Sequence, residues 1–464
     1  MNALSDFFRL VWSAVKGKEQ DYTTLGIKQS IVLLAIPMIL EMVMESLFAV
    51  VDIFFVGRLG SNALATVGLT ESVLMIIYAV GMGVSIAATA MVARRVGEKN
   101  YREAGSITFQ LIVTGSALAL LMGAVATIFA GDILALMGAE ADIITTGLNY
   151  ARIIFAGNLA IILLFLINGA FRGAGQPHLA MRALWIANGA NIILDPLLIF
   201  GIGSFNGLGL EGAAWATTIG RSLGVVYQVY HLLNGRHLLK VTRENLVISF
   251  KVILRILKVS SGGMGQFLID SASWIFLTRL IAEFGSSALA GYTIAFRVII
   301  FTILPAWGLS SAAATLVGQN LGAKKARRAE LAVWLTAKYN VAFMAVITLI
   351  FILFGEHLAA LFSKDTEVIS IASDALKIIT LGYVFFGLGM VMIQAFNGAG
   401  DTKTPSIINI VVLWLIEIPL AYLLAIYFGL AATGIFIAIA LCHSFHALVS
   451  WWLFRQGTWK KVKV

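Results

Sequence analysis

The sequence predicts an all-α integral membrane protein with twelve transmembrane helices in two six-helix lobes, related by a pseudo-twofold axis along the membrane normal. Composition, apolar runs of membrane-spanning length and an internal repeat predict this class. Hydrophobic residues make up 59% of the 464 residues, and charged residues only 12%, whereas soluble proteins hold roughly a quarter charged residues. A chain this apolar would aggregate in water.

The N-terminal residues 1–28 are expected to lie along the membrane surface. Apolar residues recur there at helical spacing with polar residues between them: Leu4, Phe7, Phe8, Val11, Trp12 and Val15. An amphipathic helix of this kind rests in the lipid interface. The segment lacks the uninterrupted apolar core of a signal peptide.

Twelve apolar runs follow, each long enough to cross a bilayer, which takes about 20 residues. They are predicted at 29–57, 64–92, 106–130, 143–170, 178–202, 209–234, 255–283, 286–317, 332–355, 367–396, 405–429 and 430–453. We therefore expect an N-lobe over 29–234 and a C-lobe over 255–453. A cytoplasmic connection at 235–254 joins them, with a second amphipathic stretch from Leu246 to Leu257. A basic cytoplasmic tail, 454–464, ends the sequence.

The basic residues fall on one side of this twelve-span arrangement. The net charge is +9, and Lys and Arg gather in the N-terminal segment, in alternate connections and in the tail. The other side has only Arg58 and Lys364. Because loops rich in Lys and Arg stay in the cytoplasm, both termini are expected there, in a multi-pass protein of the cell's cytoplasmic (inner) membrane. The positive charge needs no nucleic-acid partner.

An internal repeat relates the two halves. Residues 58–68 resemble 283–293, 91–98 resemble 316–323, and 170–175 resemble 395–400, and all three pairs share one offset along the chain. Six spans per half return the chain to its starting side, so both halves insert in the same orientation. Two such lobes, rocking about a site between them, are the usual basis of alternating access.

Carboxylates lie inside the predicted spans, where each costs on the order of 3 kcal/mol or more. Glu41, Glu45 and Asp52 share one stripe of the first span, one turn after Pro37, which should bend the helix. Asp270 in the seventh span is the counterpart of Glu45 at the offset of the repeat.

Further polar side chains gather in the fifth and sixth spans. Asn191 and Asp195 are four residues apart on one helical face, and Thr217 lies in the next span. Such oxygens suit a hard cation such as Na⁺, or the carboxylates could carry protons. Alternatively, the acids pair with hydroxyls, Arg or Lys for structure. Glu41 and Glu417 could lie near lipid headgroups or in loops, and we expect structural roles for His443 and His446.

No motif of an enzyme is present. The sequence has no Walker motif, which leaves an ion gradient as the energy source, and its single cysteine, Cys442, lies in an apolar run. We expect no cofactor. A membrane enzyme or receptor is a further alternative, disfavoured by the scarcity of His and Cys and by the short loops.

Five segments resemble the multidrug and toxic compound extrusion (MATE) family, over nearly the whole chain: PMILEMVMESLFAVVDIFFVGRLG, NGAFRGAGQP, NIILDPLLIFGIG, GLEGAAWATTIG and FNGAGDTKTP. The resemblance implies twelve helices in two lobes and export of organic, mostly cationic compounds by antiport with Na⁺ or H⁺. A functional monomer in the lipid bilayer is expected.

The resemblance also implies site residues. The family's N-lobe cation site falls on Asp52, Asn191, Asp195 and Thr217, which are all present. Some members use a C-lobe site with acids in the seventh and tenth helices. Asp270 matches the first, but the second falls on Phe386, so we expect Asp270 and Glu45 to act as substrate-contacting or secondary acids. The rival within the same architecture is a lipid-linked oligosaccharide flippase, whose phosphate-bearing substrate would favour Arg and Lys over the acids found here.

Overall fold

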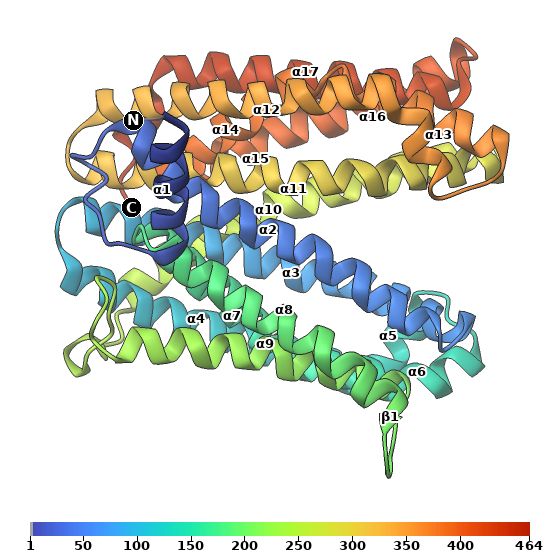
Figure 1. Cartoon of the computed structure of the whole chain (residues 1–464), viewed down its shortest axis with the longest axis horizontal. Coiled ribbons are helices and arrows are strands. Elements are labelled where there is room, and N and C mark those ends of the chain that lie inside the picture. Colours follow the sequence, from blue (N-terminus) through green and yellow to red (C-terminus); the bar gives the residue numbers. More distant parts are fainter. Residues whose placement is uncertain (1–2) are drawn as a thin grey trace.

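The computed structural model describes residues 3–464 and is almost entirely helical (Figure 1). After α1 (Ala3–Lys16), the N-lobe contains α2 (Ile27–Gly57), α3 (Ser61–Gly97), α4 (Tyr101–Ile128), α5 (Ala130–Leu136), α6 (Ala141–Ala156), α7 (Asn158–Gly173), α8 (Pro177–Phe200) and α9 (Leu210–Leu233). Across the connection, η1 (Arg243–Asn245) is a single 3₁₀ turn.

The C-lobe repeats this plan and forms the other half of the molecule, shown in yellow to red in Figure 1. It contains α10 (Phe250–Ala282), α11 (Ser286–Gly322), α12 (Ala326–Ala360), α13 (Thr366–Thr380), α14 (Tyr383–Ala399), α15 (Lys403–Asn409), η2 (Ile410–Glu417), α16 (Ile418–Tyr422), η3 (Leu423–Tyr427) and α17 (Ala431–Gln456), with a last turn η4 (Thr458–Lys461). The all-α membrane fold with two lobes is therefore as predicted.

Ten helical segments in the described residues are long and apolar enough to cross a membrane, and the pair α13 and α14, bent by 55°, makes an eleventh. The one remaining predicted span, the sixth at 209–234, corresponds to α9, which is long enough but less apolar than these. Arg221 and Gln228 lie along it, and both side chains are buried against the rest of the lobe. Helix α9 uses its polar residues for contacts inside the lobe, which explains its lower hydropathy.

Several elements differ in detail from the prediction. The fourth span is two helices, α6 and α7, separated at Gly157. Helix α10 already begins at Phe250, inside both the predicted connection 235–254 and the predicted amphipathic stretch 246–257. Helix α2 is one continuous helix that contains Pro37, and the bend expected there stays a prediction. A two-stranded hairpin, β1 (Gly201–Ile202) with β2 (Phe205–Asn206), joins α8 to α9.

The lobes meet at the end of the molecule that carries both termini, the left side of Figure 1. Gly97 at the end of α3 packs on the carbonyl oxygen of Gln319, and Gly322 at the end of α11 packs on that of Arg94. A Cβ at either glycine would overlap that oxygen. Gly322 is the counterpart of Gly97 in the repeat, and Gln319 is the counterpart of Arg94. The contact is therefore symmetric about the predicted pseudo-twofold axis.

The segment between α1 and α2 ties both lobes together at this end, which we call the inner end. Glu19 accepts a hydrogen bond from Gln176 of the N-lobe (2.7 Å). From the C-lobe, Lys325 donates to the carbonyl of Thr23 (2.9 Å) and Arg328 to that of Leu25. The inner end is thus closed by backbone contact and by this strap of residues 17–26.

The opposite ends of α3 and α11 have open surroundings among the described residues. At Gly60, Gly68 and Gly285 a Cβ would meet no atom within 4 Å. The lobes diverge toward that end, where α5, α6 and α13 lie on the right of Figure 1. The structure therefore holds the two lobes closed at the inner end and separated at the outer end.

Candidate functional site

Three of the predicted cation-site residues come together inside the N-lobe. Asn191 on α8 donates from its amide nitrogen to the Oδ1 of Asp195, one turn later (3.3 Å), and to the hydroxyl of Thr217 on α9 (3.1 Å). Asp195 is fully buried and Asn191 is 2% exposed. The four-residue spacing that suggested this pair in the sequence places both side chains on the face of α8 that packs against α9.

Two oxygen atoms of this cluster accept no hydrogen bond from the protein. Asp195 Oδ2 and Asn191 Oδ1 are both buried, and neither has a hydrogen-bond partner. A buried polar atom without a partner costs free energy, about 1–3 kcal/mol and more for a charged group. Carboxylate, amide and hydroxyl oxygens are the donor set that a hard cation prefers. The residues present therefore fit a bound cation or proton.

Asp52 on α2 lies beside this cluster. Its carboxylate is near enough to Asp195 for their charges to interact, and the same holds for Glu71 on α3. Asp52 is half-buried, whereas Glu71 is exposed. The exposure of the three acids therefore decreases from Glu71 through Asp52 to Asp195. Sequence reasoning missed Glu71, although it stands inside a predicted span.

Glu45 lies beside an arginine, as expected if the acids pair with Arg or Lys for structure. Its Oε1 lies 2.8 Å from a guanidinium nitrogen of Arg221 on α9, and its Oε2 accepts from the amide of Asn188 on α8 (2.9 Å). Arg221 is 2% exposed, and its guanidinium also lies over the ring of Phe48, 5.0 Å from the centroid. This carboxylate is balanced by a permanent positive charge. The position of Arg221 in the middle of a predicted span was the feature of the sequence that could have indicated this ion pair.

Glu41 lies deeper in the N-lobe, away from lipid headgroups and loops. It is 2% exposed, accepts a hydrogen bond from Asn168 (3.0 Å) and lies 3.5 Å from Arg172. The backbone carbonyl of Arg172 in turn accepts from Thr315 of the C-lobe (2.9 Å). The buried charges of the N-lobe therefore extend to the closed inner end.

Replacing Arg221 by Ala should destabilise the protein, because Glu45 would keep a largely buried charge with no partner. Breaking a buried pair in this way costs about 3–5 kcal/mol, and the partial exposure of Glu45 favours the lower figure. The midpoint of thermal unfolding in detergent measures the effect. Adding Glu45→Gln to the Arg221→Ala variant should recover much of the loss. Equal midpoints for the single and double variants would show that the pair does not act as a unit.

The C-lobe carries its own acids. Asp270 on α10 is near enough to Glu417, at the end of η2, for their charges to interact. Glu417 is 1% exposed and so is neither in a loop nor at a headgroup. His443 on α17 lies 3.8 Å from Glu417, and Phe386 packs its ring edge-on against the imidazole, with centroids 4.9 Å apart. Phe386 thus belongs to the wall of this cluster.

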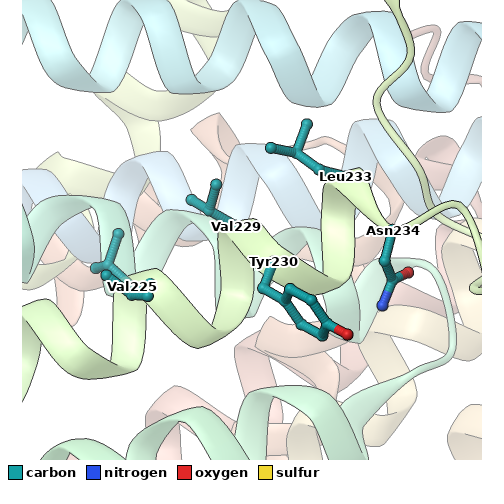
Figure 2. Close-up of a pocket in the computed structure, with 6 residues that line it drawn as sticks. Val225, Val229, Tyr230, Leu233 and Asn234 are labelled. Carbon is teal, nitrogen blue, oxygen red and sulfur yellow. The ribbon is translucent and has the colours of Figure 1, made fainter.

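A hollow of about 510 Å³ lies away from all these acids, on the surface of α9. Figure 2 shows Val225, Val229, Tyr230, Leu233 and Asn234 along it, all from one face of the helix. The surface is almost wholly apolar, and Val226 and Leu233 are each more than 60% exposed. Such a surface suits lipid chains, and it is separate from the polar site inside the lobe.

Comparison with known proteins gives consistent matches. The family model MatE matches residues 37–197 and 264–423. The probable multidrug resistance protein YoeA of Bacillus subtilis is 25% identical over 440 residues, which are 94% of this chain and 95% of that protein. The probable multidrug resistance protein NorM of Thermotoga maritima is 26% identical over 439 residues, 94% of each chain.

A solved structure has the same fold. It is described as the outward-facing conformation of a multidrug resistance MATE family transporter of the MOP superfamily, and it superposes with a TM-score of 0.89 at 26% identity. The match covers 95% of this chain and 98% of that one. The two lobes described here therefore correspond to the two lobes of that transporter.

Proposed function

The chain belongs to the MatE family of membrane transporters, and from that premise we propose that it is a secondary active multidrug efflux transporter. It exports small organic compounds, mostly cationic, in exchange for Na⁺ or H⁺, and it acts as a monomer in the cytoplasmic membrane with both termini in the cytoplasm. The names of YoeA and NorM support the class of substrate.

One observation carries the coupling part of this proposal: the buried oxygens of Asn191 and Asp195 that lack hydrogen-bond partners. We assign the coupling cation to Asp52, Asn191, Asp195 and Thr217. Asp52 and Glu71 are more exposed than Asp195, and in this proposal they provide a route of negative charge for an entering cation. The same acids attract a cationic substrate, so cation and substrate compete for one charge.

The arrangement of the lobes gives the transport cycle its states. With cytoplasmic termini, the closed inner end faces the cytoplasm, and the structure corresponds to the outward-facing state. In the proposed cycle, a cation from outside neutralises Asp52 and Asp195, and the substrate leaves. The lobes then close outside and open inside, where the inner-end contacts of Gly97 and Gly322 must separate.

The test of efflux is uptake of ethidium into inside-out vesicles, whose lumen corresponds to the cell exterior, with one gradient imposed at a time. We expect efflux to follow either a Na⁺ gradient at constant pH or a pH gradient without Na⁺. Vesicles without the protein give the background. Ethidium movement at the background rate under both gradients would contradict the proposed antiport.

A further inference from the structure

The buried carboxylates of this protein differ in how their charge is balanced. Glu41 and Glu45 each lie within 3.5 Å of an arginine, Arg172 and Arg221. Glu417 is as deeply buried as Glu41, at 1% exposure, yet no Lys or Arg of residues 3–464 forms an ion pair with it. Its charge, when ionised, therefore depends on a group that is not permanently positive.

The neighbours of Glu417 come from three elements. Ser273 on α10 donates its hydroxyl to Oε2 (3.3 Å), while Oε1 is buried without a hydrogen-bond partner and lies 3.8 Å from Nε2 of His443 on α17. Asp270 on α10 adds a second negative charge. Tyr292 on α11 also lies near enough to Glu417 to be affected by its charge.

Two further titratable groups lie on α17 near this cluster, and neither balances the acid. Cys442 is buried and interacts with Glu417 only through its charge. The Nε2 of His446 is engaged 3.0 Å from Oδ1 of Asn409 on α15. His443 alone among the described residues thus presents a ring nitrogen toward Glu417.

Aromatic rings enclose the imidazole of His443. Trp274 stacks on it with centroids 6.1 Å apart, and Phe386 packs edge-on at 4.9 Å. Glu417 itself ends η2, a π-helical stretch of eight residues. Short π-helical segments often occur at functional sites. The polar pair is therefore held in an apolar enclosure within an irregular part of the helix.

Comparison of the two halves identifies what His443 replaces. Asp270 is the counterpart of Glu45 in the repeat, and Gly212 and Gly434 each pack against the backbone of the preceding span. Arg221 follows Gly212 by nine positions, and His443 follows Gly434 by nine. This pairing has an offset of 222, three fewer than the 225 that relates Asp270 to Glu45, and it lies after the shorter connection that precedes α17. Where the N-lobe has a guanidinium, which stays charged, the C-lobe has an imidazole, which gains and loses its proton near neutral pH.

We propose that Glu417 and His443, with Asp270 beside them, form a proton-binding site in the C-lobe that is separate from the cation site of the N-lobe. A buried carboxylate such as that of Glu417, with a second carboxylate beside it, cannot stay ionised without compensation. A proton bound by the Glu417 carboxylate or by His443 supplies it. In the described residues, no three His, Cys, Asp or Glu side chains are placed to hold a metal ion.

Proton binding at this site can be tested without transport; only the use of the bound proton to drive export rests on the proposed function. Infrared difference spectra of the purified full-length protein, taken between acidic and alkaline buffers without Na⁺, report each carboxyl group by its C=O band. In the wild type we expect one C=O band of a protonated carboxyl group to be present at acidic pH and to disappear as the pH rises. In Glu417→Gln that band should be absent at every pH. Glu356→Gln, the same change at an exposed C-lobe residue, should keep that band.

A second variant keeps the test decisive if Glu417→Gln folds poorly. His443→Arg places the N-lobe's permanent charge beside Glu417, so the same band should disappear at all pH values tested. Unchanged carboxyl bands in either folded variant would overturn the proposal. Failure of ethidium efflux in the wild type, with the pH-dependent band present, would instead refute the transport function and leave the proton site standing.

Discussion

Asp195→Asn is expected to abolish efflux driven by an ion gradient while leaving the protein folded. Asp195 is fully buried, and its Oδ2 has no hydrogen-bond partner in the protein. The substitution replaces this carboxylate, whose negative charge would bind the cation, with a neutral amide. Interactions with a charged group contribute about 1.5–3 kcal/mol. Each 1.4 kcal/mol is about a factor of ten in affinity, so binding of the coupling cation should weaken by roughly ten- to a hundredfold.

The measurement is initial efflux of ethidium in vesicles under a fixed gradient, with the amount of protein in the membrane determined separately. Asp132→Asn on α5 is the matched control, because it makes the same change at an exposed acid of the same lobe. Asp52→Asn should have a smaller effect, since that residue is half-buried. Wild-type efflux by Asp195→Asn would remove Asp195 from the coupling mechanism.

Gly97→Val is expected to stop transport by a different route. Any side chain at this position overlaps the carbonyl oxygen of Gln319, which is backbone and cannot move aside alone. The inner end therefore cannot close, and the arrangement with the lobes in contact at that end is lost. Since Gly97 lies at the end of α3, each lobe should still fold.

Spin labels at Arg102 and Arg327, exposed residues of α4 and α12 at the inner end, report the separation by double electron–electron resonance. The distance between them should increase in Gly97→Val. Gly68→Ala is the control on the same helix, because a Cβ there meets no atom within 4 Å, and it should transport normally. An unchanged distance in Gly97→Val would show that the contact does not govern closure.

The fold could be predicted because its determinants are local. Apolar length identifies a span, and the shared offset of the repeated segments identifies the two halves, whatever the side chains contact. The interruption at Gly157 and the early start of α10 were not predictable in this way. Breaks within an apolar run depend on packing between helices, which hydropathy does not record.

The candidate site was predictable only in part. Asn191 and Asp195 share a helical face, so their proximity follows from spacing alone. The partner of Glu45, Arg221, is 176 residues away in the chain, and that of Glu417, His443, lies on another helix. Such pairs depend on the tertiary arrangement. The sequence therefore could not distinguish an acid with a permanent counter-charge from one without.

The contact between Gly97 and Gly322 has a consequence for the origin of the two-lobe architecture. Gly97 packs on the carbonyl of Gln319, and Gly322 packs on the carbonyl of Arg94. Gln319 and Arg94 are themselves counterparts in the repeat. In an oligomer this would be called an isologous interface, in which one surface is complementary to itself. Two copies of a single six-helix chain, with the sequence of either half, could therefore form the same contact as a homodimer. In the single chain the two halves differ inside, as Arg221 and His443 do, while each glycine keeps a backbone carbonyl of the other half as its neighbour.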